Sequence, residues 1–284
     1  METKILDGTT TSKVIREQIK ERIAKLNANG VSVTLAAVLV GDDPASHTYV
    51  KMKTRQCEAV GIGSQTYILP ASATQEEVET LVKRLSDDPD VTGILVQHPL
   101  PKGLDEYSVL AAISPAKDID GISPFSLGAL VANKVAFEAA TPKGIIALLE
   151  HYQLPIEGQR VVIIGRSVIL GKPLALMMMN RHATVTVCHT RTKDIKAISR
   201  EADILVVAAG RPELVNAEWI KPGAVVIDAG YNKVEGRQGD VGDVDYESAK
   251  QVASWITPVP GGVGPMTIAM LLTNTTDAAE QKTI

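Results

Sequence analysis

The first side chains able to do chemistry are a tyrosine and a lysine four positions apart, Tyr49 and Lys53 in the stretch SHTYVKMK. Residues at this spacing lie on one face of a helix, so the phenol and the amine would meet there. Burial lowers the pKa of a lysine, which can then act as acid and base near neutral pH. The pair indicates acid–base chemistry, and a solvated helix lysine is the alternative.

Gln97 is the second candidate, at the end of the apolar run GILVQ. Ligands in open α/β sheets bind at the carboxyl ends of strands, so this amide is placed to meet a helix-borne lysine. A neutral amide can hold the amine without raising its pKa. Asp120, in KDIDG, is the third candidate. The alternatives for these two residues are a strand-end cap and a plain Asp-Gly turn.

A loop with two glycines, GRSVILGKP, directly follows the apolar run RVVII. Gly165 and Gly171 permit a tight strand-to-helix turn whose backbone N–H groups can face a phosphate. The spacing departs from G-x-G-x-x-G, so an ordinary βα turn is the alternative. In short-chain dehydrogenases the Tyr-x-x-x-Lys helix follows the dinucleotide loop. Here the pair precedes the loop, so the order is wrong for that family.

The surroundings of this loop favour NADP over NAD as the cofactor. The next apolar run ends in CHTRT, without the carboxylate that bonds the ribose of NAD and would repel a 2′-phosphate. The residues in this neighbourhood supply cationic and hydroxyl donors instead: Arg166, Ser167, Thr190 and Arg191. A solvated surface charge is the alternative for Arg191.

The run PVPGGVGPMT is the last candidate element. After Pro260, the adjacent Gly261 and Gly262 would let the backbone approach a ligand, and a helix after Pro265 offers a positive end. We expect this run to close one wall of a cleft, and a loop stiffened by prolines is the alternative.

Alternating helices and strands must position these residues. Hydrophobic spacing predicts helices over 12–28, 45–60 and 74–86, and strands over 33–41, 65–69 and 91–97. Thr74 and Glu77 have the spacing of a capping box. Strands separated by helices of this length imply parallel, right-handed crossovers, so the first half is α/β.

The second half has β-branched runs typical of a Rossmann-like sheet, at 160–165, 183–188, 202–210 and 224–230. Residues 104–142 form a less regular, turn-rich region, a helix is expected over 143–152, and the tail after Asn274 is short and polar.

We therefore predict an α/β protein of two domains with a cleft between them. The catalytic domain spans 1–139, the Rossmann-like NADP-binding domain spans 140–257, and the segment 258–284 packs back onto the first domain.

Composition limits the class of protein. The 284 residues are 45% hydrophobic with a net charge of −4, which gives no field attractive to nucleic acid. Two cysteines far apart exclude a disulfide framework, and the five histidines lack metal-ligand spacing, so no metal is expected. Without a signal peptide or a membrane-spanning apolar run, we expect a cytoplasmic protein.

Over nearly its full length the sequence resembles the bifunctional methylenetetrahydrofolate dehydrogenase/cyclohydrolase family. The resemblance rests on SHTYVKMK, GILVQHPLP, KDIDG, TPKG, GRSVILGKP, ATVTVCH and PGGVGPMTI, which occur in the family's order. It implies a two-domain enzyme, usually a homodimer. Such an enzyme oxidises 5,10-methylenetetrahydrofolate with NADP and hydrolyses the methenyl product to 10-formyltetrahydrofolate.

By this resemblance Tyr49, Lys53, Gln97 and Asp120 match folate-site residues. Asp120 would accept paired hydrogen bonds from the amino group and ring N–H of a pterin. Three residues match the family's cofactor-phosphate residues: Arg166, Ser167 and Thr190, the last in place of the more usual serine. The sequence departs from the family's usual pattern at Ser86, Ser126 and Ala139–Ala140.

Two other functions remain open at this point. One is a different two-domain dehydrogenase of the shikimate type, in which a lysine also serves as the acid–base group. The other is a nucleotide-binding sensor that keeps the fold without catalysis.

Overall fold

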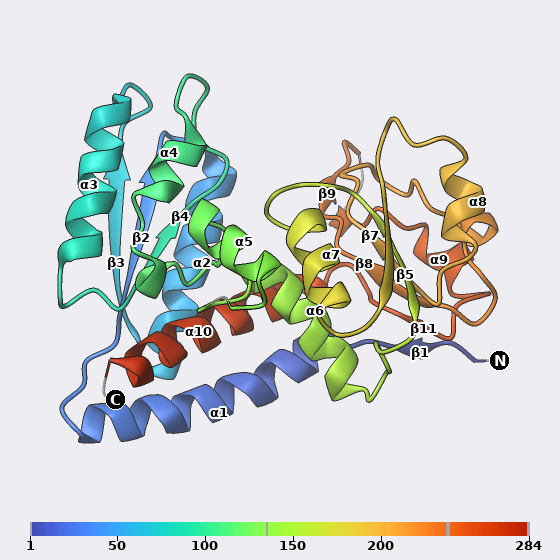
Figure 1. The fold of residues 1–284 in the computed structure, drawn as a ribbon, viewed down its shortest axis with the longest axis horizontal. Coiled ribbons are helices and arrows are strands. Elements are labelled where there is room, and N and C mark those ends of the chain that lie inside the picture. Colours follow the sequence, from blue (N-terminus) through green and yellow to red (C-terminus); the bar gives the residue numbers. More distant parts are fainter. Residues whose placement is uncertain (1, 135, 237–238, 283–284) are drawn as a thin grey trace. The chain divides into compact units, whose positions relative to one another are not determined.

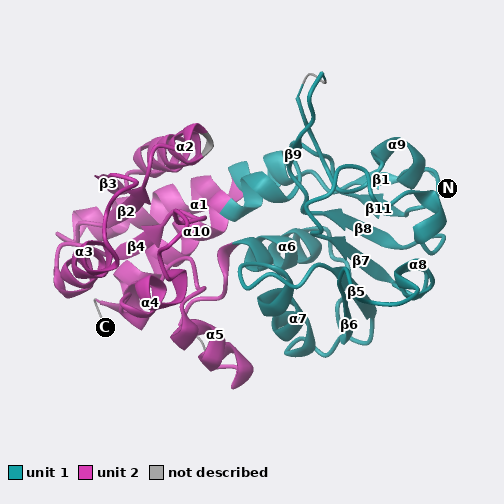
Figure 2. Ribbon diagram, turned by 90° about the horizontal axis from the view of Figure 1, so that it is seen from above, with its two compact units in different colours: residues 1–13, 141–267 teal, residues 14–140, 268–284 magenta. Residues whose placement is uncertain are grey.

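The computed structural model of the chain describes residues 2–134, 136–236 and 239–282. The chain divides into two compact units, shown in different colours in Figure 2. Unit 1 comprises residues 1–13 and 141–267, and unit 2 comprises residues 14–140 and 268–284. The division falls within the first and the last long helix, α1 (Gly8–Ala28) and α10 (Val263–Gln281).

Unit 2 contains a parallel three-stranded sheet in the order β3-β2-β4. The strands are β2 (Thr34–Val40), β3 (Gly63–Leu69) and β4 (Gly93–Val96). Its helices, labelled in Figure 1, are α2 (Pro44–Val60), α3 (Gln75–Asp87), α4 (Glu106–Ala111) and α5 (Pro124–Val131), with a 3₁₀ turn η1 at Pro115–Lys117. The predicted parallel α/β arrangement of the first half is confirmed.

The central strand β2 is buried on both faces, as a parallel strand covered by helices should be. Ala36, Val38 and Val40 share a core with Val78 and Val82 of α3. Ala37 and Leu39 point the other way and share a core with Val50 of α2. The alternation places α2 and α3 on opposite faces of the sheet.

Capping residues fix where the two helices begin. Asp43 caps α2, because its Oδ2 accepts hydrogen bonds from the backbone N and the hydroxyl of Ser46, each at 2.8 Å. The predicted capping box of α3 is confirmed: Thr74 Oγ1 accepts from Glu77 N at 3.3 Å, and Glu77 Oε2 accepts from Thr74 N at 2.7 Å.

Unit 1 contains a parallel six-stranded sheet in the order β1-β11-β8-β7-β5-β6. The strands are β1 (Lys4–Ile5), β5 (Arg160–Ile164), β6 (Thr184–Cys188), β7 (Ile204–Val207), β8 (Val225–Asp228) and β11 (Trp255–Ile256). The four predicted runs are confirmed as strands β5 to β8. The two-residue strands β1 and β11 were not predicted, because two residues are too few to show a periodicity.

The remaining elements of unit 1 are α6 (Ala140–His151), α7 (Gly171–Met179), α8 (Ile195–Ser199), a 3₁₀ turn η2 (Ala217–Trp219) and α9 (Tyr246–Ala249). A two-stranded hairpin of β9 (Asn232–Lys233) and β10 (Asp240–Val241) extends from the sheet (Figure 2). The core of the sheet includes Val162, Leu205 and Val226.

One expectation about an irregular segment, the tail, is corrected by the structure. The tail after Asn274 is not a short polar end, because α10 continues to Gln281 and buries Thr275, Thr276 and Ala278. Its threonine hydroxyls donate to carbonyls one turn back in the same helix, which lets them lie in an apolar setting. The turn-rich region 104–142 contains α4, η1 and α5 and reaches the start of α6.

Candidate active site

Lys53 and Gln97 are brought together within unit 2. Lys53 lies on α2, and Nζ donates a hydrogen bond to Oε1 of Gln97 at 3.1 Å. Gln97 directly follows β4, where its backbone N donates to Val38 O of β2 at 2.9 Å. The amide nitrogen of its side chain donates to the carbonyl of His98 at 2.7 Å, which fixes the amide so that its oxygen faces the lysine.

Burial lowers the pKa of Lys53, and the negative charge of Asp120 acts in the opposite direction. The hydrogen-bond partner, Gln97, is neutral and adds no charge that would stabilise the ammonium form. The thiol of Cys57, one turn further along α2, has a pKa raised to about 12 by burial, so it stays neutral near pH 7. This arrangement favours an amine that exchanges its proton at a lower pH than an exposed lysine.

Asp120 reaches the same region because its segment runs beside β4. Asp118 forms an isolated parallel bridge with Ile94, and a Cβ at Gly93 would lie only 2.7 Å from the side chain of Ile119. The carbonyl of Asp120 accepts a hydrogen bond from Ala140 N at 3.1 Å. Burial raises the pKa of the Asp120 carboxyl, and the positive charges of Lys53 and His98 act against that rise.

Asp118 holds the loop that carries Asp120. Its fully buried carboxylate accepts hydrogen bonds from the backbone N of Gly121 at 3.1 Å, from the backbone N of Ser123 at 2.9 Å and from the hydroxyl of Ser126 at 2.5 Å. Gly121 has φ +67°, and a Cβ there would lie 2.7 Å from backbone atoms of Phe137–Ala139. A residue larger than glycine at position 121 would therefore clash with the backbone and force the loop to move.

The positions that depart from the family's usual pattern have identifiable contacts. Ser126 donates to Asp118, as described above. Ser86 donates to the carbonyl of Ala112 at 3.0 Å and accepts from Ser114 N at 3.0 Å, which anchors the chain after α4. Ala139 and Ala140 are buried at the start of α6. Tyr49 is half-buried on α2, one turn before Lys53.

The glycine loop of unit 1 forms a tight turn between β5 and α7. Gly165 has φ +138°, and a Cβ there would lie 2.3 Å from the carbonyl oxygen of Ala208. A Cβ at Gly171 would lie 2.2 Å from the carbonyl oxygen of Gly165. Both positions therefore require glycine, and the backbone of the turn packs closely at the carboxyl end of the sheet.

The side chain of Ser167 accepts hydrogen bonds from two backbone amides of this turn. Its Oγ accepts hydrogen bonds from the backbone N of Leu170 at 3.2 Å and of Gly171 at 3.4 Å, and its carbonyl accepts from Lys172 N at 3.0 Å. The serine oxygen therefore binds the two amides just before and at the start of α7, and its hydroxyl can still donate a hydrogen bond to an anion.

The exposed donors expected around the loop lie at the ends of neighbouring strands. Arg166 and Ser167 follow β5, and Thr190 and Arg191 follow β6, all with exposed side chains. The backbone N of Arg191 donates to Nδ1 of His189 at 3.2 Å, which orders this turn. Exposed cations, hydroxyl groups and a glycine turn at one sheet edge fit the phosphates of a dinucleotide.

Pro260, Gly261 and Gly262 belong to unit 1. Gly261 has φ +112° and its carbonyl accepts a hydrogen bond from Thr9 N at 2.9 Å. A Cβ at Gly8 would lie 1.8 Å from the carbonyl oxygen of Gly262. The glycines thus allow two backbone segments to touch at the start of α1. Their predicted contact with substrate stays a prediction.

Two buried aspartates that the sequence analysis did not single out shape the loops after β7 and β8. Asp243 accepts hydrogen bonds from three consecutive backbone amides, Ala209, Gly210 and Arg211, at 2.6, 2.8 and 2.8 Å. Asp228 accepts from the backbone N atoms of Gly230, Asp243 and Val244 at 2.9, 3.0 and 2.9 Å. Burial raises the pKa of Asp228 to about 6.

The glycines in the runs IDAG and GDVGDV were the available signal for this pair of aspartates. A Cβ at Gly230 would lie 2.3 Å from the carboxyl carbon of Asp243, and a Cβ at Gly242 would lie 1.8 Å from Oδ2 of Asp228. A glycine close to an aspartate in the sequence thus indicates a carboxylate that backbone atoms approach closely. Hydrophobic spacing does not detect this pattern.

The described residues, 2–134, 136–236 and 239–282, contain no group of three or more His, Cys, Asp or Glu side chains able to hold a metal ion. Within the same ranges, no helix has both the length and the apolar character needed to cross a bilayer.

Family models of known proteins match both halves of the chain. Residues 6–120 match the family model described as tetrahydrofolate dehydrogenase/cyclohydrolase, catalytic domain. Residues 139–283 match the model described as tetrahydrofolate dehydrogenase/cyclohydrolase, NAD(P)-binding domain. Together the two models match most of the chain.

Individual relatives are similar over the whole length. Bifunctional protein FolD from Moorella thermoacetica is 52% identical over 281 residues, which cover 99% of this chain and 100% of the relative. The crystal structure of the bifunctional FolD enzyme from Campylobacter jejuni has a TM-score of 0.96 at 45% identity, covering 99% of each chain. The Trypanosoma brucei enzyme, solved with NADP cofactor and inhibitor, has a TM-score of 0.94 at 39% identity, covering 100% of this chain and 99% of that one.

Proposed function

The chain belongs to the tetrahydrofolate dehydrogenase/cyclohydrolase family, and on that premise we propose how its own residues perform both reactions. The protein is a bifunctional enzyme of one-carbon metabolism. It oxidises 5,10-methylenetetrahydrofolate in an NADP-dependent step and hydrolyses 5,10-methenyltetrahydrofolate to 10-formyltetrahydrofolate. Family membership disfavours the shikimate-type dehydrogenase and the non-catalytic sensor.

The oxidation requires little acid–base help from the protein. The folate nitrogens stabilise the cation that forms at the one-carbon unit, and NADP, when bound, supplies the hydride acceptor. The protein's main contribution is to hold the folate in one orientation. We assign this role to the Asp120 carboxylate, which is held by the loop built on Asp118 and can accept two hydrogen bonds from a pterin.

The hydrolysis requires proton transfer, and Lys53 is placed to perform it. The neutral amine takes a proton from water as the water oxygen bonds to the cationic methenyl carbon. The resulting ammonium then returns that proton to N5 as the bond between the carbon and N5 breaks. The carbinol hydroxyl on that carbon releases its remaining proton to solvent, which leaves the formyl group on N10. The lowered pKa of Lys53 supports this double use of one group.

Gln97 and Tyr49 orient the amine. Gln97 accepts a hydrogen bond from Nζ, so the lone pair that forms on deprotonation points away from the amide. Tyr49, one turn away on the same helix, lies on the same face of α2 and can fix the direction of the lysine. The amide of Gln97 carries no charge, so it does not oppose the loss of the proton from the amine.

The cofactor is held by residues of unit 1. We assign the 2′-phosphate to Arg166, Ser167, Thr190 and Arg191, which supply cationic and hydroxyl donors at the ends of β5 and β6. Gly165 and Gly171 allow the backbone between them to approach the remaining phosphates. Pro260, Gly261 and Gly262 are assigned to the folate site, as the resemblance implies.

We further propose a homodimer that acts in the cytoplasm. The family resemblance supports the dimer, and two buried free cysteines are consistent with a reducing compartment. Sedimentation equilibrium should give twice the chain mass of 30.3 kDa, and a mass of one chain would contradict the dimer.

The hydrogen bond between Lys53 and Gln97 is the observation that carries the proposed mechanism. The test is to assay the purified protein for NADPH formation from methylenetetrahydrofolate and, separately, for the decay of methenyltetrahydrofolate above its rate in buffer. We expect both activities. Absence of both activities would overturn the proposed bifunctional enzyme. Dehydrogenase activity without hydrolysis would overturn the proposed acid–base role of Lys53.

A further inference from the structure

The order of the strands in unit 1 indicates where a dinucleotide would lie. The strands run β8-β7-β5-β6, so the chain passes from β5 to β6 on one side and then to β7 on the other. In open parallel sheets ligands bind at such a switch, in the crevice outside the carboxyl ends of the two strands. Two segments line this crevice: the glycine turn after β5, residues 165–171, and the β7 loop, residues 208–211.

The β7 loop packs directly against the glycine turn. A Cβ at Gly165 would lie 2.3 Å from the carbonyl oxygen of Ala208. The backbone N of Ala208 donates to Ile164 O, at the end of β5, at 2.8 Å. Because the two segments are in contact, a movement of the β7 loop would also displace the turn that faces the phosphates.

A buried carboxylate holds the β7 loop in place. Asp243 Oδ2 accepts hydrogen bonds from the backbone N of Ala209 at 2.6 Å and of Gly210 at 2.8 Å. Its Oδ1 accepts from the backbone N of Arg211 at 2.8 Å and from the side-chain nitrogen of Asn232 at 2.9 Å. Asp243 is fully buried, whereas Gly210 and Arg211 are exposed. The N–H groups of the loop are therefore fixed from the interior, while part of the loop faces solvent.

Asp228, the last residue of β8, fixes Asp243 in turn. Its carboxylate accepts hydrogen bonds from the backbone N of Asp243 at 3.0 Å and of Val244 at 2.9 Å. Gly230 leaves the space that the Asp243 carboxyl needs, because a Cβ at Gly230 would lie 2.3 Å from its carboxyl carbon. Two buried carboxylates thus join the end of β8 to the β7 loop.

This arrangement determines which groups the β7 loop can offer to a ligand. Successive backbone N–H groups often form a nest for a phosphate, but here the Asp243 carboxylate occupies three of them. The backbone groups that remain are carbonyl oxygens, which only accept hydrogen bonds. Of the groups of a dinucleotide, the ribose hydroxyls and the amino groups of the bases can donate to them, whereas the phosphates cannot.

We propose that Asp243 is a positioning residue of the cofactor site, which holds the β7 loop against the glycine turn and presents its carbonyl oxygens to the ribose or amino groups shared by NADP and NAD. The inference rests on the proposed binding of the dinucleotide at this edge of unit 1. Asp243 itself is buried and acts on the cofactor only through the loop.

The first test uses the ligand-free protein and follows hydrogen exchange of amides 209–211 by NMR. Exchange should be slow in the parent, although two of these residues are exposed. In Asp243→Asn the side chain has one acceptor oxygen for four donors, so exchange should quicken about tenfold or more. Asp245→Asn makes the same change two positions later, at the N-cap of α9, where asparagine also serves, and should leave the exchange unchanged. Unchanged exchange in Asp243→Asn would overturn the proposal.

The second test measures the dissociation constants of NADP and NAD by titration calorimetry in the same variants. Both constants should rise about tenfold in Asp243→Asn, and by the same factor, because the two cofactors share the groups that the β7 loop meets. A loss restricted to NADP would mean that the loop contacts the 2′-phosphate. Unchanged constants together with faster exchange would mean a merely structural role. Either result would overturn the proposal.

Asn232→Ala keeps the proposal testable if Asp243→Asn does not fold. It removes one hydrogen bond to the carboxylate from a half-buried position in the hairpin. Both dissociation constants should then rise about two- to fivefold, again by the same factor. Constants equal to those of the parent would count against a role of Asp243 in cofactor binding.

Hydrolysis of methenyltetrahydrofolate checks that the rest of the protein is intact, because it needs no NADP and its acid–base residues belong to unit 2. It should stay within about twofold of the parent in all three variants. Loss of hydrolysis together with cofactor affinity would indicate general disruption and contradict the proposal. If the parent binds neither cofactor, the proposed function fails and with it the cofactor role of Asp243, while faster exchange in Asp243→Asn would still show that this residue anchors the loop.

Discussion

The amine of Lys53 donates to the side-chain oxygen of Gln97 at 3.1 Å, so its closest polar partner is a group without charge. A carboxylate in that place would raise the pKa of the lysine and keep it protonated. The carboxylate that does act on it, Asp120, is half-buried and also interacts with the charge of His98. The lysine is therefore held in place without being fixed in its charged form.

Lys53→Met should remove the cyclohydrolase activity. General acid–base catalysis contributes about 10² to 10⁴-fold, and a loss in that range is expected for methenyltetrahydrofolate hydrolysis. Affinity for NADP, measured by titration calorimetry, should not change, because the cofactor residues belong to unit 1. Lys51→Met, an exposed lysine two positions earlier on α2, is the matched control and should stay within about twofold of the parent. Normal hydrolysis by Lys53→Met would rule out the assignment.

The pH dependence of hydrolysis should report the lysine. Because the neutral amine is the active form, kcat should rise with pH, with an inflection below the ordinary lysine value of 10.5. The negative charge of Asp120 raises the pKa of Lys53, so Asp120→Asn should move the inflection down by about one pH unit while raising KM for folate. An inflection that stays in place would show that the two groups do not interact, and one that moves up would contradict the direction of the interaction.

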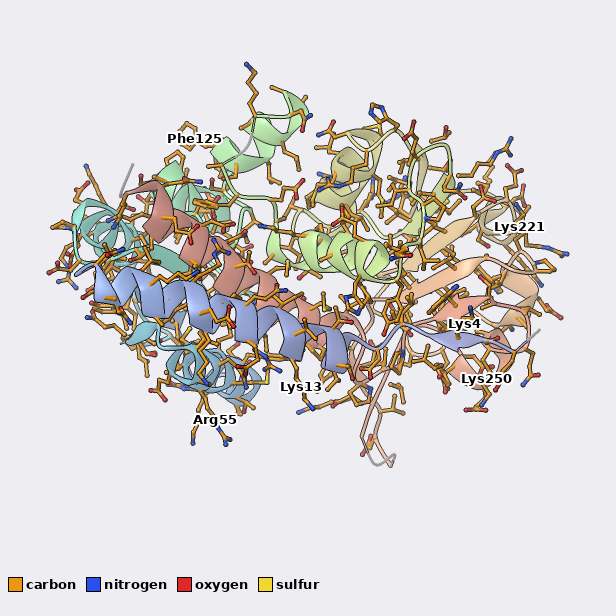
Figure 3. All side chains as sticks on the ribbon, turned by 90° about the horizontal axis from the view of Figure 1, so that it is seen from below. Lys4, Lys13, Arg55, Phe125, Lys221 and Lys250 are labelled. Carbon is orange, nitrogen blue, oxygen red and sulfur yellow. The ribbon has the colours of Figure 1, made fainter. Side chains whose placement is uncertain are left out.

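Arg166→Ala should discriminate between the two nicotinamide cofactors. Loss of a charge-assisted hydrogen bond costs about 1.5–3 kcal/mol, so the dissociation constant of NADP should rise roughly 10- to 100-fold. That of NAD should change much less, because it lacks the 2′-phosphate. Lys221→Ala is the control for net charge: this lysine projects from unit 1 in Figure 3 and pairs with Asp203, at the amino end of β7. Equal losses for NADP and NAD would place the phosphate elsewhere.

Asp228 should make unit 1 less stable as the pH rises. Its pKa is about 6 in the fold against 3.8 in the unfolded chain. Between these two pH values the folded state therefore keeps a proton on this carboxyl that the unfolded chain has lost. Its contribution is present below pH 3.8 and is lost as the pH rises to about 6, a change of about 3 kcal/mol. Asp228→Asn lacks this contribution, so its free energy of unfolding should rise more steeply from pH 4 to pH 6.5 than that of the parent.

Tryptophan fluorescence isolates the unit concerned, because the two tryptophans of the chain, Trp219 and Trp255, both lie in unit 1. Urea titrations followed at this signal compare the parent with Asp228→Asn at each pH. Parallel curves of stability against pH for the two proteins would contradict the assignment of the shift to Asp228.

Much of this fold could be predicted from local patterns. The alternating burial of β2 and the capping box at Thr74 follow from side-chain types a few positions apart, so the sequence contains them directly. The strand β1 could not be found in this way. Its stability comes from pairing with β11, a partner some 250 residues away, and neither strand has a periodicity of its own.

The residues of the candidate site likewise include some that local patterns could predict and some that they could not. Lys53, Gln97 and Asp120 could be named because strand ends and helix spacing limit where polar groups can meet. Asp118 was missed because it acts on backbone amides of its own irregular loop, Gly121 and Ser123, and hydrophobic spacing does not detect such a loop. The tail after Asn274 was misjudged because its threonines satisfy their hydroxyls within the helix and can therefore be buried.

The discontinuous make-up of unit 1 has a consequence for synthesis. Residues 1–13 emerge from the ribosome well before residues 141–267, which complete their unit. At roughly 5–20 residues per second, the early segment waits on the order of ten seconds for its partner strand. During translation β1 and the start of α1 are thus nascent chain whose partner strand has not yet been made. Leu6, which is fully buried in the fold, stays exposed to water in that interval.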